Sequence, residues 1–151
     1  MNPEHRYRIR ATSTSGRSGI ALAESVELSI PFSSPPEFNG QAGHWTPEQF
    51  FISSVASCYV STFSGMAFKS NLDFLSLHLD AEGTVGEDEG GWRFEEIVLR
   101  PRLTISHIGE RTLANRLLHR AKEKCLVARS MACPVVLETA VIIGEEAAAS
   151  N

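Results

Sequence analysis

An uncharged stretch, residues 50–67, is the feature that most constrains how this chain can fold. The residues before it form a helix start: Thr46 can cap the helix, Pro47 suits its first position, and Gln49 completes a capping box. Apolar side chains then cover most of the surface of the predicted helix, and such a helix must be buried on more than one side. In a chain of 151 residues, this pattern predicts a central helix wrapped by sheet, with a second subunit as a further source of cover.

Length, composition and charge indicate an ordinary globular chain. Its residues are 42% hydrophobic and 21% charged, which is typical of folded proteins, and the length suits one domain. We expect that domain to span residues 1–145, followed by a loose tail at 146–151. The formal net charge of -4 exerts no general attraction on nucleic acid.

The sequence predicts neither a membrane-spanning segment nor a signal for secretion. No strongly apolar stretch reaches the ~20 residues that cross a bilayer. The N-terminus also lacks the apolar segment of a signal peptide. We therefore expect a cytoplasmic protein with no nucleic-acid and no membrane partner.

The remaining hydrophobic patterns predict an α+β fold. Residues 6–11 alternate between arginine and apolar side chains, which indicates a half-buried strand with a basic outer face. Pro101 favours an edge position or a bulge in its strand. The expected elements in chain order are strands at 7–11 and 20–30 joined by a turn at 12–19, a loop at 31–43, the helix at 46–67, strands at 75–81 and 92–105 joined by an acidic turn at 86–91, a helix from Glu110 that ends by Pro134, and a strand at 135–143. The order is β-β-α-β-β-α-β, with antiparallel sheets around two long helices.

Three cysteines, Cys58, Cys125 and Cys133, are too few and too widely spaced for a secreted disulfide scaffold. Their positions alone favour core filler, because free cysteine packs as a small hydrophobic residue. No metal site is expected, since the chain has no Cys-x-x-Cys pair and its five histidines show no clustered spacing. The sequence also lacks a serine nucleophile elbow. On the residues alone, inert filler and a reactive thiol both remain open.

Four segments resemble the OsmC/Ohr family of thiol peroxidases, and they follow one another along the chain in the order found in that family. The segment Thr46-Pro-Glu-Gln-Phe-Phe-Ile-Ser-Ser-Val-Ala-Ser-Cys58 is similar to the helix that carries the first cysteine of that family. Ala121-Lys-Glu-Lys-Cys125 is similar to the segment of its second cysteine, and Leu99-Arg-Pro101 and Cys133-Pro-Val135 also resemble family sequences. The resemblance implies an intertwined homodimer, in which sheets from both chains enclose the long helices.

By position, the resemblance also implies roles for single residues. Cys58 would be the peroxidatic thiolate and Cys125 the resolving thiol. Arg17 matches the active-site arginine of the family, with Arg10 as an alternative, and Glu48 matches the glutamate that holds this arginine. The implied activity is the reduction of organic or fatty-acyl hydroperoxides to alcohols, with no metal and no bound cofactor. Electrons would come from an external dithiol, such as the lipoyl group of a lipoylated protein.

The chain departs from the family after the second cysteine. Many members have Cys-Pro-x-Ser there, whereas this chain has Cys125-Leu-Val-Ala128. The resolving partner is therefore less firmly assigned than Cys58. Cys133 is an alternative partner for Cys125, although we expect it to be filler.

The proposed chemistry requires these residue types. A thiolate attacks a peroxide, and a cysteine with an ordinary pKa of about 8.5 is mostly thiol at neutral pH. Burial alone would raise that pKa, so a guanidinium oriented by a carboxylate is expected beside the sulfur. Glu48 and Cys58 are ten residues apart, roughly 15 Å along one helix. Arg17 must therefore bridge this gap, or the glutamate must come from a partner chain, which we favour.

The substrate and an alternative function follow from the same apolar helix. We expect the site to have apolar walls, formed by Phe50, Phe51, Phe63 and Met66, which would favour peroxides with hydrocarbon chains. The alternative is a non-catalytic dimeric binding module for a lipid-like small molecule, in which the cysteines are inert.

Overall fold

The computed structural model describes residues 2–145 of the chain. The chain forms two compact units, which divide between Phe51 and Ile52. The expected single domain over residues 1–145 stays a prediction, and the expected tail at 146–151 lies outside the described residues.

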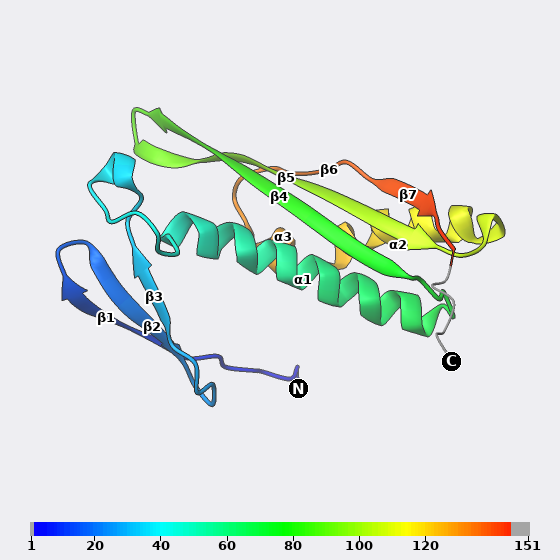
Figure 1. The fold of residues 1–151 in the computed structure, drawn as a ribbon, viewed down its shortest axis with the longest axis horizontal. Helices are drawn as coiled ribbons and strands as arrows, with labels where there is room; N and C mark the ends of the chain where they lie inside the picture. Colours follow the sequence, from blue (N-terminus) through cyan, green and yellow to red (C-terminus); the bar gives the residue numbers. More distant parts are fainter. Residues whose placement is uncertain (1, 146–151) are drawn as a thin grey trace. The chain divides into compact units, whose positions relative to one another are not determined.

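The first unit is built on a three-stranded antiparallel sheet with the order β1-β2-β3 (Figure 1). Its strands are β1 (Ile9–Ser15), β2 (Ser18–Ala23) and β3 (Ile30–Ser33). The predicted hairpin is confirmed, but its turn is tighter than expected, because Gly16 takes a left-handed φ of 53° that lets the chain reverse at once. The predicted single strand at 20–30 is wrong, since a turn at Ser25, with φ 65°, separates β2 from β3.

The predicted half-burial of the first strand is wrong for the single chain. Every residue of β1 is exposed, including Ile9 at 73%, and the preceding Tyr7 is 91% exposed. The side chains of a small sheet are buried only where another element packs on that face, and the side chains of β1 have no such cover in the described part of the single chain. The apolar residues of this strand therefore form an exposed surface rather than a core face.

The long helix α1 (Pro47–Lys69) begins where the sequence predicts. Its capping box is formed: the Gln49 N–H donates to Thr46 Oγ1 over 3.1 Å, and the Thr46 N–H donates to Gln49 Oε1 over 3.0 Å. The buried residues of α1 form one stripe, Val55, Tyr59, Phe63 and Ala67. Burial on more than one side is wrong for the single chain, because Phe51 is 37% exposed and Phe68 85% exposed.

Contrary to the expectation from the sequence, α1 is long and apolar enough to cross a membrane by length and mean hydropathy. The core helix of a water-soluble protein has the same two properties. The buried stripe of α1 belongs to the hydrophobic core of the second unit. We therefore interpret α1 as a core helix.

The second unit contains a four-stranded sheet around a long hairpin. Its strands β4 (Ser76–Asp88) and β5 (Gly91–Ile105) pair antiparallel, as predicted. The predicted last strand is instead two strands, β6 (Val135–Leu137) and β7 (Ala140–Ile143), and both pair with β5 in parallel. Pro101 accounts for the interruption. The partners of β6 end at Leu99 and those of β7 begin at Arg102, and proline has no N–H to continue the ladder between them.

The second helical segment is interrupted at Cys125. A 3-10 turn, η2 (Ile108–Glu110), leads into α2 (Arg111–Lys124), and a short helix, α3 (Leu126–Ser130), follows. Cys125 itself is extended, with φ -62° and ψ 114°. The expected single helix up to Pro134 is therefore wrong, because one extended residue redirects the chain between α2 and α3.

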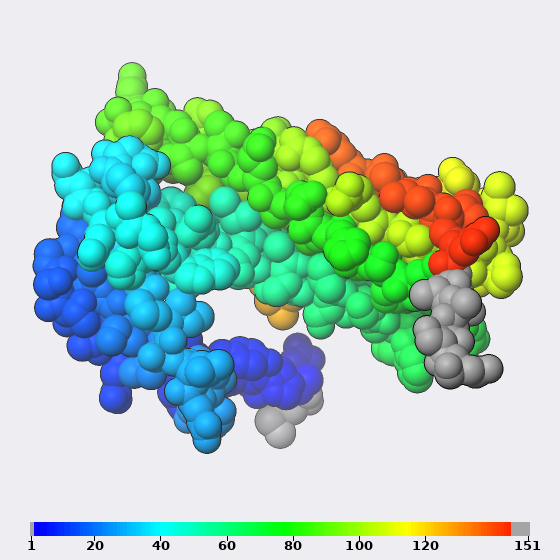
Figure 2. Space-filling view, viewed as in Figure 1, coloured from blue at the N-terminus to red at the C-terminus, as the bar shows by residue number. Residues whose placement is uncertain are grey.

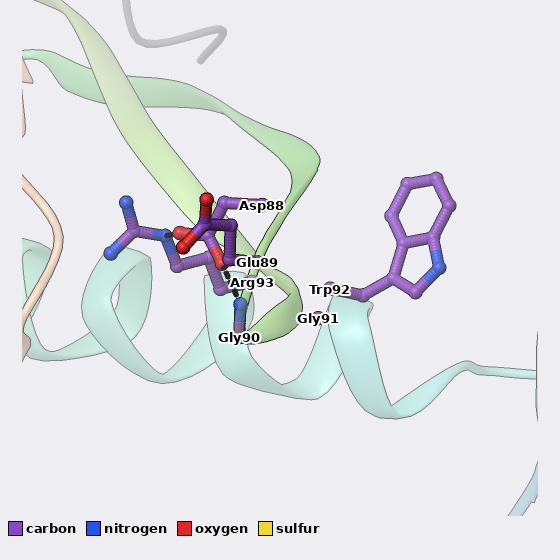
Figure 3. Close-up of a pocket in the computed structure, with 6 residues that line it drawn as sticks. All are labelled: Asp88, Glu89, Gly90, Gly91, Trp92 and Arg93. Carbon is purple, nitrogen blue, oxygen red and sulfur yellow. Dashed lines mark hydrogen bonds and ion pairs between the residues drawn. The ribbon is translucent and has the colours of Figure 1, made fainter.

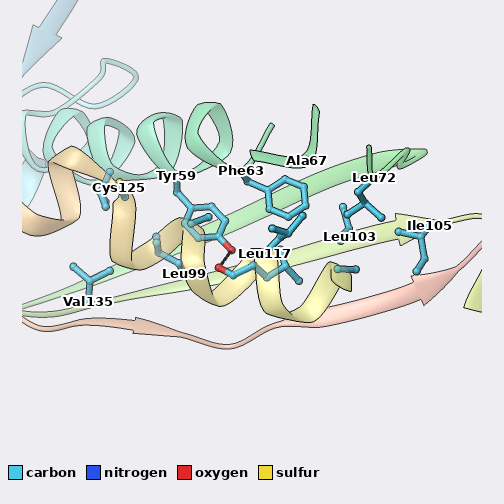
Figure 4. Close-up of a cluster of buried hydrophobic side chains, with 14 of the residues drawn as sticks. Tyr59, Phe63, Ala67, Leu72, Leu99, Leu103, Ile105, Leu117, Cys125 and Val135 are labelled. Carbon is cyan, nitrogen blue, oxygen red and sulfur yellow. Dashed lines mark hydrogen bonds between the residues drawn. The ribbon is translucent and has the colours of Figure 1, made fainter. Parts of the chain in front are cut away.

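The core of the second unit is formed by side chains from α1, α2 and the sheet (Figure 4). Its buried residues are Val55, Tyr59, Phe63, Ala67, Leu72, Ile97, Leu99, Leu103, Ile105, Ala114, Leu117, Leu118, Ala121, Cys125 and Val135. In the space-filling view, the hairpin β4–β5 and the strand β7 form one continuous surface of this unit (Figure 2). The α+β class predicted from the sequence is confirmed.

Candidate functional site

Cys58 lies in the middle of α1, next to the buried stripe of that helix. It is half-buried, and its neighbour Tyr59 belongs to the core. The Cys58 Sγ atom lies 4.0 Å from the Thr62 Oγ1 atom, one helical turn further on. The sulfur is therefore placed at the edge of the core rather than in its centre.

Cys125 is the extended residue between α2 and α3, and its side chain is fully buried. Its backbone continues the hydrogen bonds of both helices. The Cys125 N–H donates to the Ala121 carbonyl over 2.8 Å, and the Cys125 carbonyl accepts from the Arg129 N–H over 3.1 Å. These bonds hold the interruption in one defined geometry.

The structure brings the Cys58 and Cys125 thiols into contact, and each changes the pKa of the other. Burial opposes ionisation of Cys58, yet its pKa lies below the ordinary value, because hydrogen bonds from the Val127 N–H, the Cys125 and Thr62 side chains and the Leu126 N–H stabilise the thiolate. For Cys125, burial raises the pKa, and the neighbouring Cys58 raises it further, against the effect of nearby backbone N–H groups. This pair can therefore hold a thiolate on the accessible sulfur and a proton on the buried one.

Sequence reasoning missed the donors around Cys58. Val127 and Leu126 lie at the start of α3, where backbone N–H groups have no partner within the helix. Backbone donors leave no signature in the residue types, so the sequence carries no direct signal for them. The one indirect signal is the departure from Cys-Pro-x-Ser, because Leu126 has a backbone N–H donor that proline at this position would lack.

Arg17 and Glu48 both belong to the first unit. Arg17 follows Gly16 in the turn between β1 and β2, and its Nη1 donates over 2.5 Å to the Phe38 carbonyl of the 3-10 turn η1 (Pro36–Phe38). The Glu48 Oε2 atom is buried and has no hydrogen-bond partner among residues 2–145. Within the described part of one chain, then, Arg17 and Glu48 do not form the expected ion pair. Their roles stay predictions, as does the alternative role of Arg10, an exposed residue of β1.

The four residues expected to line the substrate site have different surroundings. Phe50 stacks on Trp45, with the ring centroids 5.7 Å apart, while Phe51 is partly exposed. Met66 is half-buried against the core of the second unit. Phe63 is fully buried, with its ring 5.5 Å from that of Phe74. Within this chain Phe63 is therefore a core residue, and its expected role in the substrate site stays a prediction.

Cys133 lies in the segment between α3 and β6 and packs, half-buried, against the core. Among the described residues, no group of three or more His, Cys, Asp or Glu side chains could hold a metal ion. All three cysteines are free thiols. These surroundings agree with the interpretation of Cys133 as filler.

A separate hollow of about 550 Å³ lies at the tip of the β4–β5 hairpin and is lined by residues 88–93 (Figure 3). Two of the charged residues there, Asp88 and Arg93, are paired with each other. Asp88 accepts a hydrogen bond from the Gly90 N–H over 2.8 Å, and it forms an ion pair of 2.8 Å with Arg93. The hollow therefore belongs to the acidic hairpin turn and contributes no residue to the cysteine pair.

Comparison with known proteins places this fold in a family. The sequence model described as "OsmC-like protein" matches residues 40–140, more than half of the chain. The protein YmaD of Bacillus subtilis (strain 168) is 26% identical over 148 residues, which cover 95% of this chain and 99% of that protein. An organic hydroperoxide resistance protein of Xanthomonas axonopodis pv. citri (strain 306) is 28% identical over 121 residues, which cover 79% of this chain and 82% of that protein.

Solved structures show the same fold. The OsmC-like protein VCA0330 of Vibrio cholerae superposes with a TM-score of 0.81 at 21% sequence identity. The superposition covers 90% of this chain and 99% of that structure. The family suggested by the cysteine segments thus agrees with the sequence match and with the architecture of the chain. The chain belongs to the OsmC-like protein family.

Proposed function

We propose that this chain is a cysteine-based peroxidase that reduces organic hydroperoxides, alkyl or fatty-acyl, to alcohols. The observation that carries the proposal is the contact between Cys58 and Cys125, in which the accessible thiol has the lowered pKa and the buried thiol the raised one. A similar protein named for organic hydroperoxide resistance supports the same class of substrate. A role in redox chemistry under peroxide stress is the broader conclusion, and the two-cysteine cycle is its specific form.

The cycle has three steps. The Cys58 thiolate attacks the peroxide oxygen of ROOH; the O–O bond breaks, ROH leaves after taking up a proton, and Cys58 becomes a sulfenic acid. The Cys125 thiol then attacks that sulfur, a Cys58–Cys125 disulfide forms, and water leaves. An external dithiol, such as a dihydrolipoyl group on a partner protein, finally reduces the disulfide to two thiols and is itself oxidised to a cyclic disulfide. No bound cofactor enters this cycle.

The active form in this proposal is a homodimer in the cytoplasm. The exposed apolar side chains of one chain support a second copy: Tyr7 is 91% exposed, Leu28 82% and Phe68 85%. The buried and unpartnered Oε2 atom of Glu48 supports it as well, because a buried carboxylate needs a cation. We assign that cation to the Arg17 guanidinium of another copy, with Phe50, Phe51 and Met66 as the apolar contacts of the substrate.

The first test compares two cysteine variants. Cys58→Ser should abolish the turnover of cumene hydroperoxide while the circular dichroism spectrum stays that of the wild type. Cys133→Ser is the matched control, since it removes a half-buried thiol of the same core and should keep at least about half of the activity. Catalytic turnover by Cys58→Ser would exclude the proposed mechanism.

The same exposed apolar surface supports a second candidate, a dimeric binding module for a lipid-like small molecule. Thiol alkylation at different pH values separates the two functions. A peroxidase requires Cys58 to react with iodoacetamide at a lower pH than an ordinary thiol. If all three cysteines reacted only near the ordinary thiol pKa, the binding module would be favoured.

A further inference from the structure

We propose that the Tyr59 hydroxyl is a positioning group that holds α1 and α2 in the register at which the Cys58 and Cys125 thiols meet. The inference rests on the proposed peroxidase cycle, in which these two thiols form a disulfide. It assigns a role to a residue that takes no part in the chemistry itself. Tyr59 acts through the helices, by the position that it gives to its neighbour Cys58.

The structural basis is a hydrogen bond inside the core. Tyr59 is fully buried in α1, and its hydroxyl donates to the Leu118 carbonyl of α2 over 2.8 Å (Figure 4). Apart from this hydroxyl, the Tyr59 ring lies in the same apolar cluster as Val55, Phe63 and Ala121. A phenylalanine would fill nearly the same space, so packing alone does not explain the hydroxyl group.

A buried polar group of this kind specifies position more sharply than apolar packing does. Apolar cores tolerate small shifts of their helices with little change in free energy. A hydroxyl without a partner in such a core is strongly unfavourable. A shift of α1 along α2 would break the bond from Tyr59 to Leu118, so the bond selects one register, as buried polar residues do in coiled coils.

The two ends of this bond lie close in sequence to the two thiols. Tyr59 directly follows Cys58, and Leu118 precedes Cys125 by seven residues, about two turns of α2. A disulfide requires Cβ atoms about 3.5–4.5 Å apart, so a shift of a fraction of a turn would prevent it. The bond therefore fixes the relative position of the two helices at which the two sulfur atoms are in contact.

The phenol keeps its proton throughout the cycle. Burial raises the pKa of Tyr59 far above its ordinary value, and a negative charge on Cys125 raises it further. The hydroxyl therefore remains a donor to Leu118 when either thiol ionises. This constancy suits a positioning role, because the geometry does not change as protons move between the sulfur atoms.

The test uses Tyr59→Phe and measures the two oxidation steps separately in single-turnover experiments. Dimedone trapping reports the sulfenic acid on Cys58, and non-reducing mass spectrometry reports the disulfide. We expect Tyr59→Phe to leave the rate of sulfenic acid formation within about twofold of the wild type, and to slow disulfide formation at least about tenfold, as expected for misplaced reactants. In glutathione buffers, its disulfide should also be reduced at a less reducing potential.

Ile105→Val is the matched control. Ile105 is fully buried in β5 and belongs to the same core, so the variant loosens the core without touching the bond between α1 and α2. It should lower the thermal midpoint yet keep the wild-type rate of disulfide formation. The inference is overturned if Tyr59→Phe forms the disulfide as fast as the control does. A wild-type protein that forms no Cys58–Cys125 disulfide would overturn the proposed function as well, and so the two failures are distinguishable.

Discussion

The Cys125 side chain lies against the Cys58 sulfur, and the pKa values of the two thiols shift in opposite directions: at Cys58 hydrogen bonds outweigh the effect of burial, whereas at Cys125 burial raises the pKa. Cys58 is half-buried and receives hydrogen bonds, whereas Cys125 is fully buried at the break between α2 and α3. The more accessible thiol is thus the better nucleophile, and the buried thiol is placed to attack it after oxidation. A lowered pKa on the thiol that attacks the peroxide, with a second thiol beside it, suits the first two steps of the proposed cycle.

Replacement of Leu126 by proline should raise the pKa of Cys58. The variant removes one N–H donor to the thiolate, and it should fold, because proline is favoured at the first position of a helix and Cys125 before it is already extended. The rate of Cys58 alkylation rises with pH through its pKa, so the midpoint of that profile should move to higher pH. Leu126→Ala keeps the N–H and should keep the wild-type midpoint. An unchanged midpoint in the proline variant would show that this donor does not stabilise the thiolate.

Cys125→Ser should stop the cycle after its first step. Cys58 would still be oxidised, but no second thiol would be in place to displace water from the sulfenic acid. We expect the reduced variant to consume about one equivalent of cumene hydroperoxide per chain and to form a dimedone adduct on Cys58. Peroxide consumption can be followed with xylenol orange. Turnover at the wild-type rate with dihydrolipoamide as the dithiol would mean that Cys125 is not the resolving thiol.

Glu48→Gln tests whether the buried carboxylate has a partner in the working protein. If a guanidinium from another copy binds it, the loss of that charge-assisted pair should reduce kcat/KM at least about tenfold. If Glu48 stays unpartnered, the same change removes a buried charge and should instead raise the free energy of unfolding. Glu37→Gln, at an exposed position of η1, is the control for a change in net charge. Peroxidase kinetics and urea denaturation together separate these results.

Phe63→Ala should destabilise the protein by about 3–5 kcal/mol, because it removes a fully buried ring from the core. The loss would be seen in urea denaturation as a lower midpoint. Met66→Ala removes a half-buried side chain of the same helix and should cost clearly less. If Phe63→Ala altered the substrate preference without any loss of stability, Phe63 would belong to the substrate site after all.

Elements with strong local signals were predictable from the sequence. The capping box fixes the start of α1, and its uncharged run identifies a core helix. The long hairpin follows from its alternating pattern and its glycine-rich turn. Cys58 could be placed on its helix, and the family resemblance joined it with Cys125 into a pair.

Features that depend on tertiary pairing were not predictable in the same way. The parallel pairing of β6 and β7 with β5 depends on how the chain returns after α3, and no local pattern records that path. Cys125 is extended, but neither it nor its neighbours is a glycine or proline that would indicate a break between two helices. The exposure of Ile9 was not predictable from the alternating pattern either. Alternation shows which side chains share a face of the strand, but it does not show whether another part of the same chain covers that face.

The central claim is that peroxide joins Cys58 to Cys125. The most direct measurement is mass spectrometry of the non-reduced, proteolysed protein after one equivalent of cumene hydroperoxide has been added to the fully reduced chain. We expect one disulfide-linked peptide pair, containing Cys58 and Cys125, with Cys133 still a free thiol. Unmodified Cys58, or a disulfide that pairs Cys125 with Cys133 and leaves Cys58 free, would contradict it.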